Sequence, residues 1–271
     1  MRQTLFESED LLVVKVPGHR EDVVFVTFES LQPSREPGRL GFGEAFFAKR
    51  GYTAYHFMPS GNCWYQYAEM PEALARVRAD IAAGARVVTY GISMGAYAAY
   101  RFSEPLAADA VIAFSPQYSI DPRRVWWERR WRTQGRARMW DRKLPRKEAV
   151  KHVFYDPLNQ DRRHIRGLQR EAELDLVRIY FGGHHSSRIL QECGLLEGAV
   201  LDIGHGRFDS AAFERQVWRQ RLASATYHQV RGRKGLVRRL RYRLAEALIE
   251  RRIGQPSCED AGPLLPDRGS V

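Results

Sequence analysis

The sequence predicts an α/β fold, a mostly parallel, doubly wound sheet in a three-layer α/β/α arrangement. Strand-like apolar runs alternate with helix-like stretches from Leu11 to about Phe181, which is the order that βαβ units produce. The apolar runs are nearly continuous, as expected of strands buried on both faces. The chain has 271 residues, of which 44% are hydrophobic and 28% charged, so it can bury a sizeable core.

The expected elements follow one another with recognisable start and stop signals. We expect strands at 11–16, 22–28, 52–58, 86–90, 110–114, 150–155 and 174–181, and helices at 43–50, 71–83 and 93–103. Pro71 and Gly84 delimit the clearest helix. Residues 1–230 are expected to form one domain with a basic, Trp-rich insertion at about 118–148. Residues 231–271 are expected to form a basic amphipathic helix and a disordered tail.

The net charge of +11 is concentrated in two segments. Residues 122–148 contain eleven basic and three acidic residues, and residues 231–252 contain nine and two. The remainder is mildly acidic, and no nucleic-acid recognition motif accompanies the charge, so nucleic acid is not the expected partner. We expect instead that 123–147 and 231–252 contact an anionic surface. Four leucines recur every four residues at Leu236, Leu240, Leu244 and Leu248, as in a helix that docks on the domain, on a partner or on anionic lipid.

The remaining composition favours a cytoplasmic protein without a metal or cofactor. Cys63, Cys193 and Cys258 are odd in number and widely spaced, which fits neither a disulfide framework nor a zinc cluster. No apolar run approaches the ~18 residues of a transmembrane segment, and the acidic first residues lack the apolar core of a signal peptide. Nucleotide-binding fingerprints and clustered metal ligands are likewise absent from the sequence.

One short pattern carries chemistry. Gly91-Ile92-Ser93-Met94-Gly95 forms G-x-S-x-G between a predicted strand and a predicted helix, an arrangement that lifts a serine hydroxyl above the edge of a sheet. Glycine is required on both sides because larger side chains would collide with neighbouring backbone. The helix N-terminus directs N–H groups at developing negative charge. The pattern predicts Ser93 as a nucleophile.

In this pattern and in its strand order the chain resembles the α/β-hydrolase family over roughly residues 11–196. The resemblance implies that an acid and then a histidine follow the serine, each on a loop after a later strand. For the acid, Asp161 is preferred to Asp156 because Pro157 and Asn159 predict a turn that aims it inward. The alternative, purely structural interpretations are that Asp156 forms a turn and that Asp161 is a helix N-cap.

Three histidines follow glycine-containing turns late in the chain. His184 directly follows a glycine pair after the last expected core strand, which is similar to the family's histidine position. His185 is the alternative for the catalytic histidine, and His205 after Gly204 is a weaker candidate for the same role. By contrast, His164 is expected on a helix surface.

The resemblance also implies an oxyanion hole of two backbone N–H groups. One would be that of Met94, and the other would come from Glu29 in the loop after strand 22–28. That loop lacks a His-Gly pair, so the sequence leaves the identity of the second N–H donor undetermined.

Aromatic residues surround the expected site. Asn62, Trp64 and Tyr65 follow strand 52–58 and are expected to line the pocket, although the two aromatic rings would serve equally as buried anchors. The resemblance implies a lid at the position of the insertion 118–148. Within it, Trp127 and Trp131 are spaced to share a helix face. Arginine and tryptophan together suit an anionic or carbohydrate substrate.

These features predict a serine hydrolase that acts through an acyl-enzyme, with a small-molecule or glycan carboxylic ester as substrate. The same machinery would support acyl transfer or deacylation on a glycan if water were excluded from the site. A different class of protein, which has lost catalysis and binds an anionic polymer or membrane surface, is the further alternative.

Overall fold

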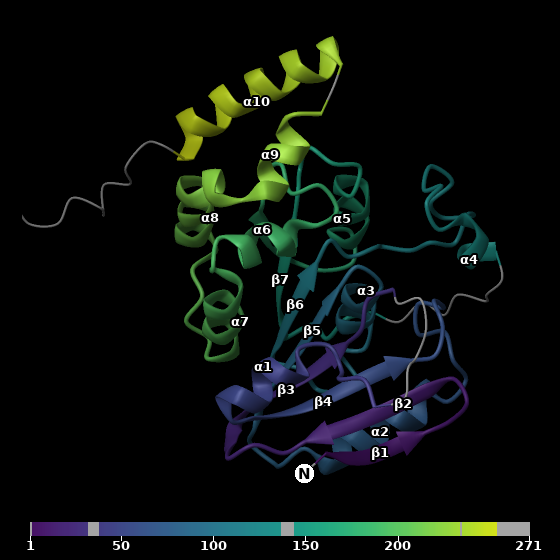
Figure 1. The fold of residues 1–271 in the computed structure, drawn as a ribbon. Helices are drawn as coiled ribbons and strands as arrows, with labels where there is room; N and C mark the ends of the chain where they lie inside the picture. The colour runs from purple at the N-terminus through teal and green to yellow at the C-terminus, as the bar shows by residue number, and fades with distance from the viewer. Residues whose placement is uncertain (1, 32–37, 137–143, 234, 254–271) are drawn as a thin grey trace, which may run out of the picture.

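In the computed structural model, which describes residues 2–31, 38–136, 144–233 and 235–253, eight strands form one sheet (Figure 1). They are β1 (Gln3–Glu7), β2 (Leu11–Val16), β3 (Arg20–Phe28), β4 (Tyr52–Pro59), β5 (Arg86–Ile92), β6 (Ala110–Phe114), β7 (Val150–Tyr155) and β8 (Asp175–Arg178). Their order across the sheet is β1-β2-β4-β3-β5-β6-β7-β8. Strands β4, β3, β5, β6, β7 and β8 are mutually parallel, whereas β1 and β2 pair antiparallel at one edge.

The predicted parallel, doubly wound sheet is therefore confirmed, with differences at both edges. Strand β1 was not expected from the sequence, and its first two residues are exposed. Strand β8 has four residues where the apolar run predicted eight, because Tyr180 and Phe181 already form a turn. The chain order reverses where β3 lies between β4 and β5, and such a reversal opens a crevice at the carboxyl ends of the strands.

Helices cover both faces of the sheet and create two cores. One face carries α2 (Met70–Asp80), α3 (Met94–Arg101) and α5 (Arg162–Leu168). The other carries α1 (Glu44–Arg50), α6 (Ser186–Glu192), α7 (Leu196–Gly204), α8 (Ser210–Gln220), the short 3₁₀ helix Arg221–Ala223, α9 (Ala225–Arg231) and α10 (Leu236–Ile253). Alternate strand residues supply the two cores, as Val24 and Val26 of β3 do for the first and Val23 and Phe25 for the second.

The Trp-rich insertion between β6 and β7 differs from its prediction. Its helix in the described residues is α4 (Arg132–Arg136), and the segment before α4 consists of turns, so the expectation that Trp127 and Trp131 share a helix face is wrong. The Trp127 ring packs on His164 and the Trp131 ring on Trp64. The Glu128 carboxylate accepts the Arg130 backbone N–H at 2.9 Å, and such side-chain bonds to local backbone compete with helix formation. Residues 137–143 lie outside the described residues.

Helix α10 docks on the second core with a face other than its leucine stripe. Tyr242, Ile249 and Ile253 are buried against that core, and Glu246 pairs with Arg231 of α9 at 2.6 Å. Leu240, Leu244 and Leu248 are instead 58%, 64% and 56% exposed, and the side chain of Leu236 and the tail from residue 254 are outside the described residues. No helix in the described part of the chain is both long and apolar enough to cross a membrane.

Candidate active site

Ser93 lies at the tight turn between β5 and α3. Its backbone has φ 53° and ψ −114°, a strained conformation for a residue with a side chain. A Cβ at Gly91 would lie 2.2 Å from the carbonyl carbon of Gly95, and one at Gly95 would lie 2.0 Å from the Phe28 oxygen. The two glycines are therefore required because backbone of the turn and of β3 fills the space that side chains would need.

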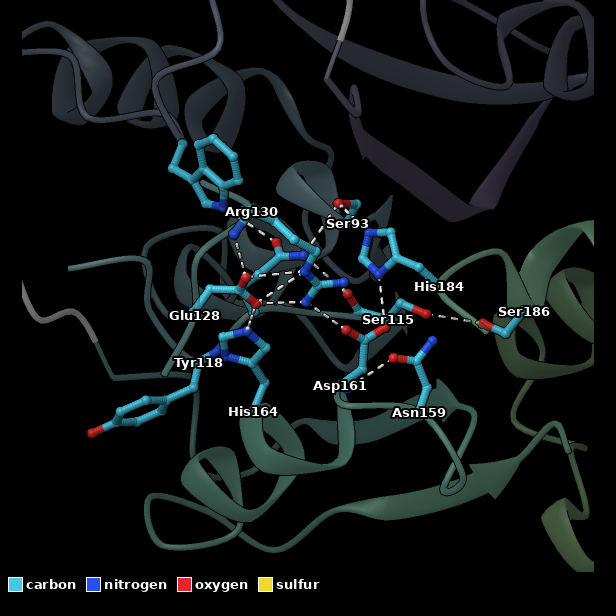
Figure 2. A network of polar contacts seen from close by, with 12 residues as sticks. Ser93, Ser115, Tyr118, Glu128, Arg130, Asn159, Asp161, His164, His184 and Ser186 are labelled. Atoms are coloured by element: carbon cyan, nitrogen blue, oxygen red, sulfur yellow. Dashed lines mark hydrogen bonds and ion pairs between the residues drawn. The ribbon is translucent and has the colours of Figure 1, made fainter. Parts of the chain in front are cut away.

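The structure brings Ser93, His184 and Asp161 into one hydrogen-bonded chain (Figure 2). Ser93 Oγ lies 2.9 Å from His184 Nε2, and His184 Nδ1 lies 2.7 Å from Asp161 Oδ2. An ionised carboxylate only accepts hydrogen bonds, so His184 Nδ1 donates to Asp161. This leaves Nε2 as the acceptor for the Ser93 hydroxyl proton.

The competing residues occupy other positions. The buried carboxylate of Asp156 accepts the backbone N–H groups of Leu158 at 2.8 Å and of Gly183 at 2.9 Å, so it holds the turn that precedes His184. Burial raises the pKa of Asp156 to about 7, against the lowering effect of those N–H groups. His185 stands at the N-cap position of α6, and its side chain makes no capping hydrogen bond. His205 bonds the Tyr52 hydroxyl at 2.7 Å, and Tyr52 begins β4, so His205 lies at the opposite end of the parallel strands from Ser93.

Asp161 also pairs with a cation from the insertion, Arg130. The Arg130 guanidinium lies 2.8 Å from Asp161 Oδ1 and 2.6 Å from Glu128 Oε2, and Figure 2 shows Arg130 and His184 approaching Asp161 together. Burial alone would raise the pKa of Asp161, but the hydrogen bond with His184 and the charges of His184 and Arg130 hold it below its usual value. The Asp161 carboxylate is therefore kept ionised.

The same network corrects the expectation for His164. Its side chain is fully buried and not on a helix surface, and its Nε2 lies 3.0 Å from Glu128 Oε2. Its Nδ1 accepts the backbone N–H of Tyr118 at 3.2 Å, so Nε2 carries the proton and donates to Glu128. Burial lowers the pKa of His164, against the raising effect of Glu128. His164 thus orients Glu128, which in turn orients Arg130.

Gln117 is a residue of the site that sequence reasoning missed. Its Oε1 accepts the Trp64 indole N–H at 3.2 Å, and its Nε2 lies 3.2 Å from Ser93 Oγ. Because an indole nitrogen only donates, Trp64 fixes the amide so that its NH₂ faces Ser93. The sequence signal was the position of Gln117 soon after strand 110–114, since carboxyl ends of parallel strands share one edge of the sheet.

The expected second oxyanion donor is corrected by the sheet order. The Glu29 N–H donates to the Phe57 oxygen of β4 at 3.4 Å, and β4 and β5 lie on opposite sides of β3. This N–H therefore points away from Ser93. Met94 is the first residue of α3, so its N–H has no acceptor within the helix and is available to a ligand.

Two of the three expected pocket residues, Trp64 and Tyr65, are internal. Tyr65 is fully buried and donates to the backbone oxygen of Glu29 at 2.9 Å, so it is an internal anchor and not a pocket wall. Trp64 is also buried and acts on Ser93 through Gln117, while Asn62 is partly buried. The Trp131 ring lies 5.3 Å from Trp64 and 6.3 Å from His184 and forms an aromatic side of the site. Among the described residues, no group of His, Cys, Asp and Glu could hold a metal ion.

The chain is similar in fold to solved structures, whereas no family model and no curated protein matches its sequence. The capsule O-acetyltransferase of Neisseria meningitidis serogroup A is 12% identical with a TM-score of 0.53, covering 74% of this chain and 93% of that one. Thermogutta terrifontis esterase 2 is 16% identical with a TM-score of 0.50, covering 77% and 96%. The 2,6-dihydroxy-pseudo-oxynicotine hydrolase is 13% identical with a TM-score of 0.50, covering 78% and 67%.

Proposed function

The chain has the α/β-hydrolase fold, and we propose that it is a serine hydrolase that forms an acyl-enzyme on Ser93. The observation that carries this proposal is the hydrogen-bonded chain from Ser93 to His184 at 2.9 Å and from His184 to Asp161 at 2.7 Å. A hydroxyl, an imidazole in the correct tautomer and an ionised carboxylate are the three groups that acyl transfer through serine requires. The proposed substrates are carboxylic esters of small molecules or glycans.

The first half-reaction uses the tautomer that the geometry sets. Ser93 Oγ attacks the acyl carbon while its proton passes to His184 Nε2, and Asp161 stabilises the resulting imidazolium. The tetrahedral intermediate then expels the alcohol, which takes the proton from Nε2. In the second half-reaction a water molecule attacks the acyl-enzyme, gives its proton to Nε2 and releases the acid, and Ser93 recovers its proton.

Two donors are proposed to stabilise the oxyanion. One is the Met94 N–H at the start of α3, and the other is the Gln117 side-chain amide in place of Glu29. The amide is buried and its orientation is fixed before the substrate arrives, so it needs little reorganisation as charge develops. In the resting site the same NH₂ group donates to Ser93 Oγ, which leaves the serine proton for His184.

Acyl transfer to a hydroxyl is a second candidate function. It is supported by the similarity of fold to an enzyme named as a capsule O-acetyltransferase. The acyl-enzyme is the same, and the two functions differ in whether water or an alcohol attacks it. The ratio of free acid to transferred ester, measured while glycerol or a glycan acceptor is titrated, distinguishes them.

The test is covalent labelling with a fluorophosphonate, read by intact mass and peptide mapping. We expect one adduct on Ser93 that is absent in Ser93→Ala and formed far more slowly in His184→Ala, since loss of one triad member lowers turnover by about 10⁴-fold or more. His205→Ala is the matched control, because that histidine lies at the other end of the strands. Absence of labelling in folded protein would contradict the proposal and favour an inactive protein that binds an anionic polymer or membrane.

A further inference from the structure

A cavity of about 820 Å³ opens beside His184. Three parts of the chain that are distant in sequence form its wall. The loops after β7 and β8 contribute Asn159, His184 and His185, the insertion contributes Arg130, and the C-terminal segment contributes residues of α9, of the following linker and of α10. Both basic segments of the sequence therefore meet at the proposed catalytic histidine.

The charged residues on this wall differ in whether they already have an ion-pair partner. Arg130 is held between Asp161 and Glu128. Arg233 and Arg241 are exposed, and neither has an ion-pair partner among the residues that the structure describes. Asp156 also lines the cavity, but its two oxygens each accept a backbone N–H. The cavity thus presents two free guanidinium groups to whatever enters it.

His185 lies near one of these cations. Burial lowers the pKa of His185, and the charges of His184, Arg188 and Arg233 lower it further, against the raising effect of Asp161. The neutral imidazole that results donates one hydrogen bond from one nitrogen and accepts one on the other. Guanidinium forks and an imidazole are groups that recognise phosphate and carboxylate oxygens.

The lining of the cavity includes His184 but not Ser93, so an ester held at Ser93 would extend past the His184 ring to reach it. In the proposed mechanism His184 Nε2 returns the proton to the departing oxygen, so the alcohol must lie against His184. Val230 and Tyr242 add apolar surface to the same wall, against which the carbon skeleton of the alcohol can pack.

We propose that this cavity binds an anionic group, a phosphate or carboxylate, carried by the alcohol part of the substrate, through Arg233 and Arg241. The part of the inference that assigns the anion to a substrate rests on the proposed function, whereas the anion site itself can be tested without turnover. It assigns to the C-terminal segment a role in selecting the ester that reaches Ser93.

The first test compares three acetate esters of matched shape. They are 3-carboxyphenyl acetate, 3-phosphonooxyphenyl acetate and the neutral 3-carbamoylphenyl acetate. We expect a higher kcat/KM for one or both anionic esters than for the neutral one, and the better of the two identifies the anion. Equal kcat/KM for all three would overturn the proposal.

The variants separate the cavity from the general charge of the protein. Arg233→Ala and Arg241→Ala should each lower kcat/KM for the anionic esters by about three- to fivefold, the upper range for exposed charge pairs, and leave the neutral ester unchanged. Arg239→Ala is the matched control, since Arg239 is also exposed on α10 and removes the same charge without lining the cavity. An equal loss in Arg239→Ala would show a long-range field and overturn the assignment.

The second test measures inorganic phosphate binding to Ser93→Ala by calorimetry. We expect binding that Arg233→Ala with Arg241→Ala abolishes and Arg239→Ala preserves. If phosphate binds in this way while wild-type protein resists the fluorophosphonate, the anion site stands and the proposed function falls. If Ser93 is labelled but phosphate does not bind and the esters are not distinguished, the proposed function stands and this inference falls.

Discussion

Replacing Arg130 with methionine tests whether the insertion holds the candidate acid in place. Methionine keeps much of the length of the arginine stem but leaves two carboxylates without their shared cation. Asp161 and Glu128 are each only 1% exposed, and the Arg130 side chain is 26% exposed. Removing one partner of a buried ion pair costs about 3–5 kcal/mol. Because water reaches part of Arg130, we expect the lower end, about 3 kcal/mol of unfolding free energy, or roughly 6–10 °C in Tm.

Urea and thermal unfolding at pH 7, followed by circular dichroism, measure this loss. Arg123→Met is the matched control, because Arg123 lies in the same insertion and pairs with Asp121 at 3.0 Å but is 79% exposed. Exposed pairs contribute about 0–1 kcal/mol, so the control should be almost as stable as the wild type. Fluorophosphonate labelling of Ser93 should slow in Arg130→Met and not in the control.

Two further results sharpen the test. Glu128→Gln in the Arg130→Met background should recover part of the lost stability, because it removes one of the two buried charges that Arg130 balances. Interactions within the folded state lower the pKa values of Asp161 and Glu128, so their stabilisation is present above the unfolded pKa near 4 and is lost as the pH falls. If Arg130→Met were as stable and as reactive as Arg123→Met, the role assigned to Arg130 as a positioning residue would be refuted.

Three other variants probe the turn, the amide and the buried carboxyl. Gly95→Ala would place a Cβ 2.0 Å from the Phe28 oxygen and should abolish labelling and lower Tm. In the control Gly198→Ala the added Cβ meets no atom within 4 Å, and the change should stabilise α7 by about 0.5–1 kcal/mol. Equal Tm values for the two variants would contradict this prediction. Gln117→Leu should lower kcat by about 10²–10³-fold, as loss of an oxyanion donor does, with little change in circular dichroism, and unchanged kcat would exclude the amide. Folding raises the pKa of Asp156 to about 7, so the folded state holds a proton that the unfolded state releases, and the contribution of Asp156 to the unfolding free energy should fall as the pH rises from about 4 to 7. Asp156→Asn should flatten this trend in urea titrations. An equally steep trend in the variant would contradict the prediction.

The sequence predicted those features that depend on local pattern. Continuous apolar runs identified the six parallel strands, and the G-x-S-x-G pattern predicted Ser93 at the end of one of them. These elements follow from neighbours in sequence, so the sequence alone contains the needed information. Asp161 and His184 were predicted with the help of the resemblance to the α/β-hydrolase family, which implies the order serine, acid, histidine, and the turn chemistry of Pro157 and Asn159 favoured Asp161 over Asp156.

The features that the sequence could not predict depend on contacts between distant segments. Whether the Glu29 N–H faces Ser93 is decided by the position of β4 beside β3, and no local pattern encodes that pairing. The buried place of His164 depends on Glu128, which is 36 residues away in sequence. Likewise, the exposed leucine stripe of α10 has ideal helical spacing, but Tyr242, Ile249 and Ile253 fit the second core and decide which face docks.

Because His184 and Arg130 both contact Asp161, the proposed activity depends on two separate segments of the chain. One of the two side-chain partners of Asp161, His184, is on the loop after β8, while the other, Arg130, belongs to the insertion between β6 and β7. Partial opening of the insertion would withdraw Arg130 and leave the sheet and its two cores intact. Proteins commonly open in such sub-global units at free energies below that of complete unfolding. Inactivation and unfolding are then separate events, and the temperature at which Ser93 ceases to react should lie below the temperature at which the helices melt.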